Sequence, residues 1–281
     1  MPAMSNYLHD KILNQQFRAT AFTFPATMGM ALAAGDLPTA DDTGATFPEV
    51  SGGAYARKDV SPSTSNWNLS DDGATNKATV TFAQATADWL NPHSWGLFDS
   101  TSANAGNMLF FGPITNPGPV TASTPPVSFT PNAIRISLDA GAIMNDYLHD
   151  NLMNQIFRGT AYTFVSAIYF CLCTEMPTAD DTGSTIVEPG SAYARQLVTA
   201  NTTNWAASDN GTYNLTTVTF PQATGSWGNV VGWAIADAVT TGNVLFQGPL
   251  KTPATITASS PPATFLPGNI MIALDGLTGG M

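Results

Sequence analysis

The triplet Asp-Thr-Gly occurs twice in the chain, as Asp42-Thr43-Gly44 and as Asp181-Thr182-Gly183. One such triplet in each half of a chain is how aspartic proteases present two carboxylates that share a proton. In those enzymes the triplet ends a hydrophobic strand, which buries both acids. Here Pro and polar residues precede it, a pattern typical of a solvated Asx-turn. We therefore expect Asp42 and Asp181 to lie in exposed turns, too far apart to share a proton.

The histidines and cysteines do not form a metal-binding pattern. Cys171 and Cys173 lie two apart in an apolar run, which suits neither a disulfide nor a zinc site, so we expect two small buried residues. His9 and His149 recur at matching positions and are expected on the exposed side of a helix, whereas His93 occurs in the first half only. Gly-x-Ser-x-Gly, His-Glu-x-x-His and phosphate-loop motifs are missing from the sequence. The sequence thus predicts no enzyme, no cofactor and no metal.

Four basic residues recur in both halves and are candidates for structural ion pairs: Arg18, Arg57, Arg158 and Arg195. Acids that also recur offer them partners: Asp10 and Asp150, Asp99 and Asp237, Glu49 and Glu188, Asp139 and Asp275. We expect ion pairs between a loop and a strand, with a contact to another subunit as the alternative.

Charge and composition exclude several classes of partner. The net charge is −11, only nine residues are Lys or Arg, and charged residues make up 10% of the chain, against roughly 25% in ordinary soluble domains. Without a basic stripe, nucleic acid and anionic membranes are disfavoured as partners. The start carries no secretory signal and no apolar run reaches about 18 residues, so we expect a protein made and kept in a cytoplasm.

The chain is a tandem repeat. Tyr7–Arg18 and Tyr147–Arg158 agree at 8 of 12 positions, and later motifs keep nearly the same register. The offset between the halves shrinks where residues were lost between shared motifs, which marks those gaps as loops. We therefore predict a first domain over 1–139, a linker over 140–145 and a second domain over 146–281.

Each half predicts one short amphipathic helix followed by strands. Asn6 and Asp146 are candidate N-caps, and apolar residues follow at helical spacing. In the first half we expect strands at 27–33, 54–60, 78–82, 95–99, 107–113, 127–129 and 134–139. A Ser/Asn/Gly-rich stretch follows the second of these strands. The fold class is therefore all-β, with two tandem antiparallel β-sandwich or jelly-roll-like domains, each opening with one short α-helix. Trp95 and Trp233, and Phe82 and Phe220, are expected at matching core positions.

Five short motifs carry a resemblance to a known family: Asn6-Tyr7-Leu8, Thr20-Ala21-Phe22-Thr23, Gly53-Ala54-Tyr55-Ala56-Arg57, Val80-Thr81-Phe82 with Ala85-Thr86, and Gly242-Asn243-Val244-Leu245-Phe246-Gln247-Gly248. Together they resemble small virion proteins of tailed phages, usually labelled phage structural or tail-fibre proteins. Each half resembles one whole member. The resemblance implies a structural protein of the virion, assembled in the host cytoplasm.

Two placements in the virion follow from this resemblance. The sequence lacks heptads, collagen-like repeats and a shaft, and its acidic surface suits the outside of a DNA-filled shell. We therefore favour a capsid cement or decoration protein that bridges subunits of the major capsid protein. A tail-fibre or receptor-binding tail protein is the alternative. Other virion proteins and further copies of this chain are additional candidate partners.

The loops that differ between the halves are the candidate contact surfaces. In the first half they are 89–93, with Trp89, Asn91 and His93, and 100–106, with Ser100 and Asn104. Divergence at these places is expected if the two halves meet different neighbours. Deleting the loop 100–106 is expected to weaken binding to heads without unfolding the domain.

Overall fold

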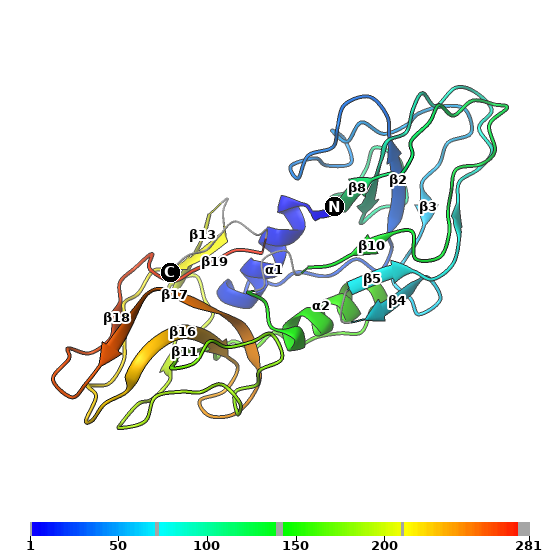
Figure 1. Cartoon of the computed structure of the whole chain (residues 1–281). Coiled ribbons are helices and arrows are strands. Elements are labelled where there is room, and N and C mark those ends of the chain that lie inside the picture. Colours follow the sequence, from blue (N-terminus) through cyan, green and yellow to red (C-terminus); the bar gives the residue numbers. More distant parts are fainter. Residues whose placement is uncertain (1, 71–72, 139–142, 209–210, 275–281) are drawn as a thin grey trace. The chain divides into compact units, whose positions relative to one another are not determined.

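Antiparallel strands dominate the chain (Figure 1). The computed structural model describes most residues: 2–70, 73–138, 143–208 and 211–274. Within them two helices occur, α1 (Asn6–Arg18) and α2 (Asp146–Arg158), one at the start of each repeat. The predicted all-β class with one opening helix per repeat is confirmed. Residues 140–142 of the predicted linker, and the acids Asp139 and Asp275, lie outside the described residues.

The helices begin as their sequences indicate, but the caps lie one residue earlier than predicted. Ser5 Oγ accepts a hydrogen bond of 3.2 Å from the backbone N–H of Leu8. Asn145 caps α2 in the same way, through a 3.0 Å bond to the backbone. Asn6 and Asp146 are instead the first helical residues. The side chain of the preceding residue is the one that can reach the unpaired N–H groups of the first turn.

The strands of the first repeat form one large and two small sheets, all antiparallel. The large sheet has the order β1 (Ala3–Met4), β8 (Met108–Pro113), β7 (Ser94–Phe98), β2 (Gly29–Ala33), β3 (Lys58–Asp59). The smaller sheets are β10 (Arg135–Ile136), β5 (Gly73–Asn76), β4 (Trp67–Ser70), and the pair β6 (Val80–Thr81), β9 (Ser128–Phe129).

The second repeat has the same topology. Its large sheet has the order β12 (Gln196–Leu197), β11 (Tyr169–Cys173), β16 (Gly228–Ala236), β17 (Val244–Ile256). Its small sheets are β13 (Trp205–Ser208), β14 (Gly211–Asn214), β19 (Met271–Ile272), and the pair β15 (Val218–Thr219), β18 (Thr264–Phe265). An isolated bridge between Met144 and Phe246 stands where β1 pairs with β8 in the first repeat.

The strand predictions need two kinds of correction: one stretch forms strands that were not expected, and some expected strands are shorter. The Ser/Asn/Gly-rich stretch forms the hairpin β4–β5, which its lack of apolar alternation concealed. Gly73 makes this hairpin possible, because its φ is +113° and a Cβ there would lie 2.1 Å from the carbonyl oxygen of Ile136. The strands predicted over 78–82 and 134–139 are shorter, as β6 and β10, and the strand predicted over 54–60 is reduced to β3. Ala54 adopts a φ of 62°, which breaks the extended conformation before the strand can form.

The predicted core residues occupy matching places in the two repeats. Trp95 and Trp233 are 2% and 1% exposed, and Phe82 and Phe220 are equally buried. Cys171 and Cys173 are free and buried, as predicted. Burial raises the pKa of the Cys173 thiol to about 12, so both cysteines act as small apolar residues.

The two repeated histidines are buried, contrary to prediction. His9 and His149 are each only 3% exposed. His9 lies four residues before Leu13 and seven before Gln16, and all three belong to one face of α1. The buried face of α1 is therefore wider than its apolar residues alone indicate, because it also includes the polar side chains of His9 and Gln16.

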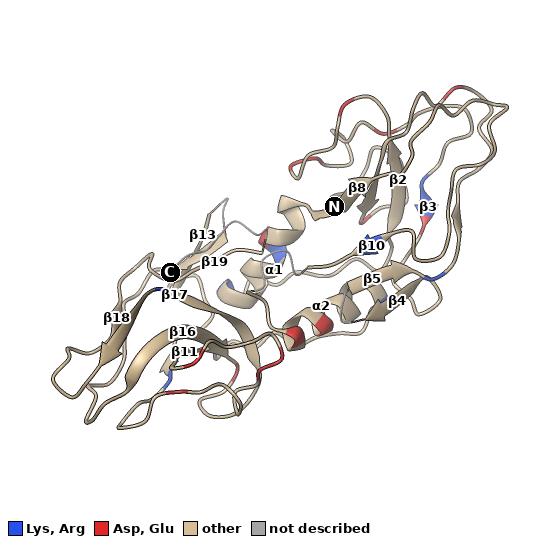
Figure 2. Cartoon of the chain, viewed as in Figure 1, with Lys and Arg blue, Asp and Glu red and all other residues tan. Residues whose placement is uncertain are grey.

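Charged residues are few and scattered along the described chain, and most of the ribbon in Figure 2 is tan. Thr, Ser, Asn and Gly residues occupy much of the exposed surface instead. Neither α1 nor α2, the helices of the described residues, has the length and apolar character needed to cross a bilayer.

The compact units of the fold do not coincide with the repeats. The chain divides into two units, one built on Thr23–Leu138 and one built on the strands that follow Tyr162. Unit 1, the first of these, also contains Leu152–Ala161, the second part of α2. Unit 2 contains Asp10–Phe22, the larger part of α1. Each unit therefore includes a helical segment from the other repeat.

The aromatic end of α2 lies in the core of unit 1. The Phe157 ring is fully buried, 4.7 Å from the ring of Trp67 and 5.6 Å from that of Phe110. The carbonyl oxygen of Phe157 accepts a 2.9 Å hydrogen bond from the N–H of Ser63. Such ring pairs add about 0.5–1.5 kcal/mol each beyond the burial of apolar area.

Unit 2 repeats this arrangement with the end of α1. The Phe17 ring is fully buried, 4.7 Å from Trp205 and 5.2 Å from Phe246. These three residues are the counterparts of those in unit 1, and the distances agree closely. Both units are thus completed by the same contact, made by the helix of the other repeat.

One difference between the helices leads to a prediction of stability. Gln16 is fully buried in unit 2, and its amide N and O have no hydrogen-bond partner in the described part of the chain. The matching residue of α2 is Ile156. An unsatisfied buried polar group costs about 1–3 kcal/mol, so Gln16→Ile is expected to raise the free energy of unfolding of unit 2 by about 1 kcal/mol or more. Ile156→Gln is expected to lower the free energy of unfolding of unit 1. Scanning calorimetry measures both; a lower melting temperature for Gln16→Ile would show that the amide is hydrogen-bonded.

Candidate functional site

A buried ion pair forms at the same place in both units. Arg57 Nη2 lies 2.7 Å from Glu49 Oε2, and neither side chain is exposed. Arg195 Nη2 lies 2.8 Å from Glu188 Oε2, with side chains that are 3% and 20% exposed. These are two of the four arginines singled out from the sequence, paired with two of the recurring acids.

In unit 1 the arginine connects three segments of the chain. Its Nε and Nη2 donate to the two carboxylate oxygens of Glu49, at 2.9 and 2.7 Å. Its Nη1 donates to the carbonyl oxygens of Ser100 and Ala105, at 3.0 and 2.8 Å. The guanidinium carbon also lies 3.9 Å from the ring centre of Phe98. Arg57 therefore holds the turn between β7 and β8 against the segment that contains Glu49.

Tyr55 extends this network to the large sheet. Its hydroxyl donates to Glu49 Oε1 at 2.9 Å and accepts from the backbone N–H of Leu32 in β2, also at 2.9 Å. Burial and then the nearby Glu49 charge raise the pKa of Tyr55 well above its ordinary value, so the hydroxyl stays protonated. The other carboxylate oxygen of Glu49 accepts from the N–H of Asn104 at 3.0 Å. The buried charges thus have hydrogen-bond partners on every side.

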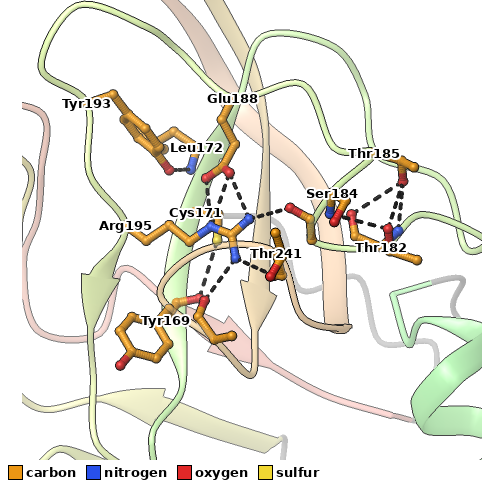
Figure 3. A network of polar contacts seen from close by, with 12 residues as sticks. Tyr169, Cys171, Leu172, Thr182, Ser184, Thr185, Glu188, Tyr193, Arg195 and Thr241 are labelled. Carbon is orange, nitrogen blue, oxygen red and sulfur yellow. Dashed lines mark hydrogen bonds and ion pairs between the residues drawn. The ribbon is translucent and has the colours of Figure 1, made fainter.

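Unit 2 has a corresponding network around Arg195, shown in Figure 3, in which the Tyr193 hydroxyl accepts from the N–H of Leu172 at 2.8 Å. Arg195 donates to Glu188 and, through Nη1, to the carbonyl oxygens of Ala238 and Thr241, both at 2.8 Å. Its Nη2 donates further to Gly183 O at 2.6 Å. Burial alone would lower the pKa of Arg195, but the hydrogen bond to Glu188 raises it above the ordinary value. The guanidinium therefore remains charged.

The spacing of these pairs shows that the contact is kept while the loops vary. Arg57 lies eight positions after Glu49 in the first repeat, and Arg195 lies seven positions after Glu188 in the second. One residue was gained or lost between them, yet the bidentate pairing is the same. The intervening segment can therefore differ in length by one residue while its ends still pair.

The Asp-Thr-Gly triplets shape the loop beside each network. Asp42 Oδ2 accepts from the N–H of Thr39 at 2.7 Å. The donor lies three residues before Asp42, whereas in an Asx-turn the side chain bonds the backbone two residues after it. The turn therefore differs from the predicted Asx-turn. Gly44 donates its N–H to Gly106 O at 2.8 Å, and a Cβ at Gly44 would lie 2.1 Å from Ala105 O. Only glycine can approach the β7–β8 turn so closely.

Asp181 has the same structural role in unit 2. Its carboxylate accepts from the N–H of Thr178 at 2.7 Å and from the hydroxyl of Thr185 at 2.8 Å. Partial burial acts to raise the pKa of Asp181, but these hydrogen bonds outweigh it and the pKa is lowered. A carboxyl group that shares a proton has a raised pKa instead. Asp42 and Asp181 are half-buried and lie in different units.

The remaining predicted arginines have a different environment. Arg18 and Arg158 lie in the last turns of α1 and α2, where a positive charge stabilises the negative end of the helix dipole. Arg18 Nη1 donates to Asn14 Oδ1 at 2.6 Å. The recurring acid Asp99 accepts instead from the backbone and side-chain N–H groups of Asn107, at 2.6 and 2.7 Å.

The predicted contact residues of the first repeat differ in exposure. Trp89 is only 2% exposed, and its indole N–H donates to Gly53 O at 3.0 Å, so this side chain belongs to the core. Asn91 and Asn104 are exposed. His93 and Ser100 are half-buried, and the His93 ring is within hydrogen-bond distance of Ser94 and Gly35.

The two predicted contact loops do not form one surface. Residues 89–93 precede β7 and residues 100–106 follow it, so the loops lie at opposite ends of this five-residue strand. At about 3.3 Å per residue, the strand separates them by about 13 Å or more. The turn over 100–106 is the one that the ion-pair network holds in place.

Sequence reasoning missed the tyrosines and the backbone carbonyls of the network. Tyr55 and Tyr193 recur two residues before the arginines, and this repeated Tyr-x-Arg spacing is the signal that could have identified them. The carbonyl partners have no side-chain signature. In the described residues, no cluster of three or more His, Cys, Asp or Glu side chains could hold a metal ion.

The network leads to a prediction of stability. Arg57→Met leaves Glu49 buried without its cation, which is expected to lower the free energy of unfolding of unit 1 by about 3–5 kcal/mol. The double variant Arg57→Met/Glu49→Leu is expected to recover much of this loss. Lys58→Met at the neighbouring half-buried position is the control and should change little. Urea unfolding followed by tryptophan fluorescence measures all three; similar values for Arg57→Met and Lys58→Met would contradict a structural role.

Comparison with known proteins gives the same division into two repeats. The family model described as podophage GP4 fiber I protein gp80 matches residues 3–137 and again residues 143–273. No curated protein matches the chain. Because the family model covers nearly the whole chain, once per repeat, this protein is a member of the podophage GP4 fiber I protein gp80 family and contains two copies of its fold.

Proposed function

We propose that this chain is a structural, non-enzymatic component of a podophage fibre, and that it acts by binding neighbouring virion proteins. The observation that carries the proposal is the match of a fibre-protein family to each repeat separately. A fused pair presents two binding units on one chain, so the second contact with a neighbour is intramolecular.

The geometry of the turns supports a mechanical role. In each unit a buried arginine holds the turn between two central strands of the large sheet through two carbonyl oxygens, at 2.8–3.0 Å in unit 1 and 2.8 Å in unit 2. A turn fixed in this way loses little conformational entropy when it binds a partner. Thr101, Ser102 and Asn104 are exposed on the turn of unit 1. They are the surface that we propose for the contact.

Capsid cement is the second candidate, and the net charge of −11 favours it. An acidic protein on the outer face of a DNA-filled shell is repelled from the packaged phosphates and stays outside. In that role the two units would bridge neighbouring subunits of the major capsid protein. The family description names a fibre, and for this reason we place the fibre first.

Labelling of intact particles distinguishes the two placements. Antibodies to this chain, bound to gold and viewed by electron microscopy, are expected to label the fibres. The control is the same antibody on particles that lack the chain. Labelling spread over the whole head surface would overturn the fibre assignment and support cement.

A second measurement tests the proposed contact. Deletion of the turn 100–106 would remove the carbonyl partners of Arg57, so substitution of exposed side chains is the better probe. The variant Thr101→Lys/Ser102→Lys is expected to reduce incorporation into particles at least several-fold while leaving the melting temperature unchanged. The control, Lys58→Met, alters a half-buried side chain of unit 1 outside this turn and should leave incorporation unchanged. Normal incorporation of the first variant would exclude this turn from the contact.

A further inference from the structure

Each compact unit is completed by a helix that belongs to the other repeat. Unit 1 takes Leu152–Ala161 from the second repeat, and unit 2 takes Asp10–Phe22 from the first. We infer that each repeat is a helix acceptor whose partner is a second copy of the same repeat, and that this chain is a helix-exchanged dimer joined into one polypeptide. This inference does not depend on where the protein lies in the virion.

The donor and acceptor residues are the same in both directions. Phe17 contacts Trp205 and Phe246, and its counterpart Phe157 contacts the matching Trp67 and Phe110. Each repeat thus offers the same donor ring and the same acceptor rings, which is the self-complementary pattern of an isologous interface. A repeat therefore carries both halves of the interface.

The first turn of each helix stays with its own repeat. Ser5 precedes α1, and its N–H donates to Leu109 O in β8 at 3.0 Å. Asn145 precedes α2 and donates in the same way to Leu245 O in β17, at 3.0 Å. The helix thus starts on the large sheet of its own repeat, and from Asp10 or Leu152 onward its residues belong to the other unit.

The acceptor is an apolar site made of residues that are otherwise deeply buried. Trp67 and Trp205 are each 1% exposed, and Phe110 and Phe246 are fully buried. Without the helix of the other repeat, the rings of Phe17 and Phe157 and their acceptors would lose the contacts that bury them. Exposed apolar patches of this kind promote association, and the occupant that fits is a second copy of the repeat.

Fusion makes this exchange independent of concentration. Two separate repeats would have to meet before each could complete the other, whereas the linked repeats meet at a high effective concentration. The loops differ in length between the repeats, but the contact between helix and acceptor does not change. Its four acceptor rings and two donor rings are of the same residue types in both repeats.

Cleavage of the intact chain tests the inference directly. A protease site is placed at residues 139–142 of the full chain, which is folded first and cut afterwards. The two pieces are expected to elute together at the size of the uncut chain in size-exclusion chromatography and to separate in urea. Pieces that separate in native buffer into two folded monomers would overturn the inference.

Two matched variants of the uncut chain give an independent readout. Phe17→Ala is expected to increase hydrogen exchange at least several-fold in β16 and β17 of the second repeat, with little change in β7 and β8. Phe157→Ala is expected to do the reverse. Each variant is the control for the other, and mass spectrometry of peptides reports both units. An effect of Phe17→Ala confined to strands of its own repeat would overturn helix exchange even if the cut pieces stayed together.

Discussion

The packing of a helix-end phenylalanine against a tryptophan and a phenylalanine is the contact on which both compact units depend. Phe17 and Phe157 are fully buried at equivalent places, with ring separations of 4.7 Å to the tryptophans. Burial of one such ring contributes about 1.5–3 kcal/mol. This is a large share of the 5–15 kcal/mol by which a typical domain is stable. Since the helix comes from the other repeat, the stability of each unit depends on both halves of the chain.

The Arg–Glu pairs have a different physical role. Taking two charges out of water costs several kcal/mol, and attraction between them offsets this only when further hydrogen bonds satisfy the remaining donors and acceptors. Here Tyr55, Asn104 and two carbonyl oxygens complete the coordination in unit 1. The pair therefore adds positional specificity: it determines where the β7–β8 turn lies. A turn fixed from inside leaves its outer side chains free to vary.

The ring contacts that complete each unit and the ion pairs that fix the turns fit a structural protein of the phage virion. Three residues that could do chemistry have structural surroundings: the carboxylate of Asp181 holds a turn, and the thiols of Cys171 and Cys173 are buried. The described surface has few charges and many short polar side chains. Two copies of one fold in a single chain then carry two separate turns, which we propose as the contacts with neighbouring proteins.

Much of the local structure was determined by the sequence itself. Helical spacing predicted α1 and α2, and apolar strands predicted β2, β7 and β8, because these patterns follow from which side chains avoid water. The hairpin β4–β5 escaped prediction, since close backbone approach at Gly73 forms it without an apolar pattern. The burial of His9 and Trp89 is a result of tertiary packing that their sequence positions do not indicate. The tertiary structure alone decided which repeat each helix completes. The two repeats carry the same donor and acceptor rings, so these ring contacts are the same in either arrangement.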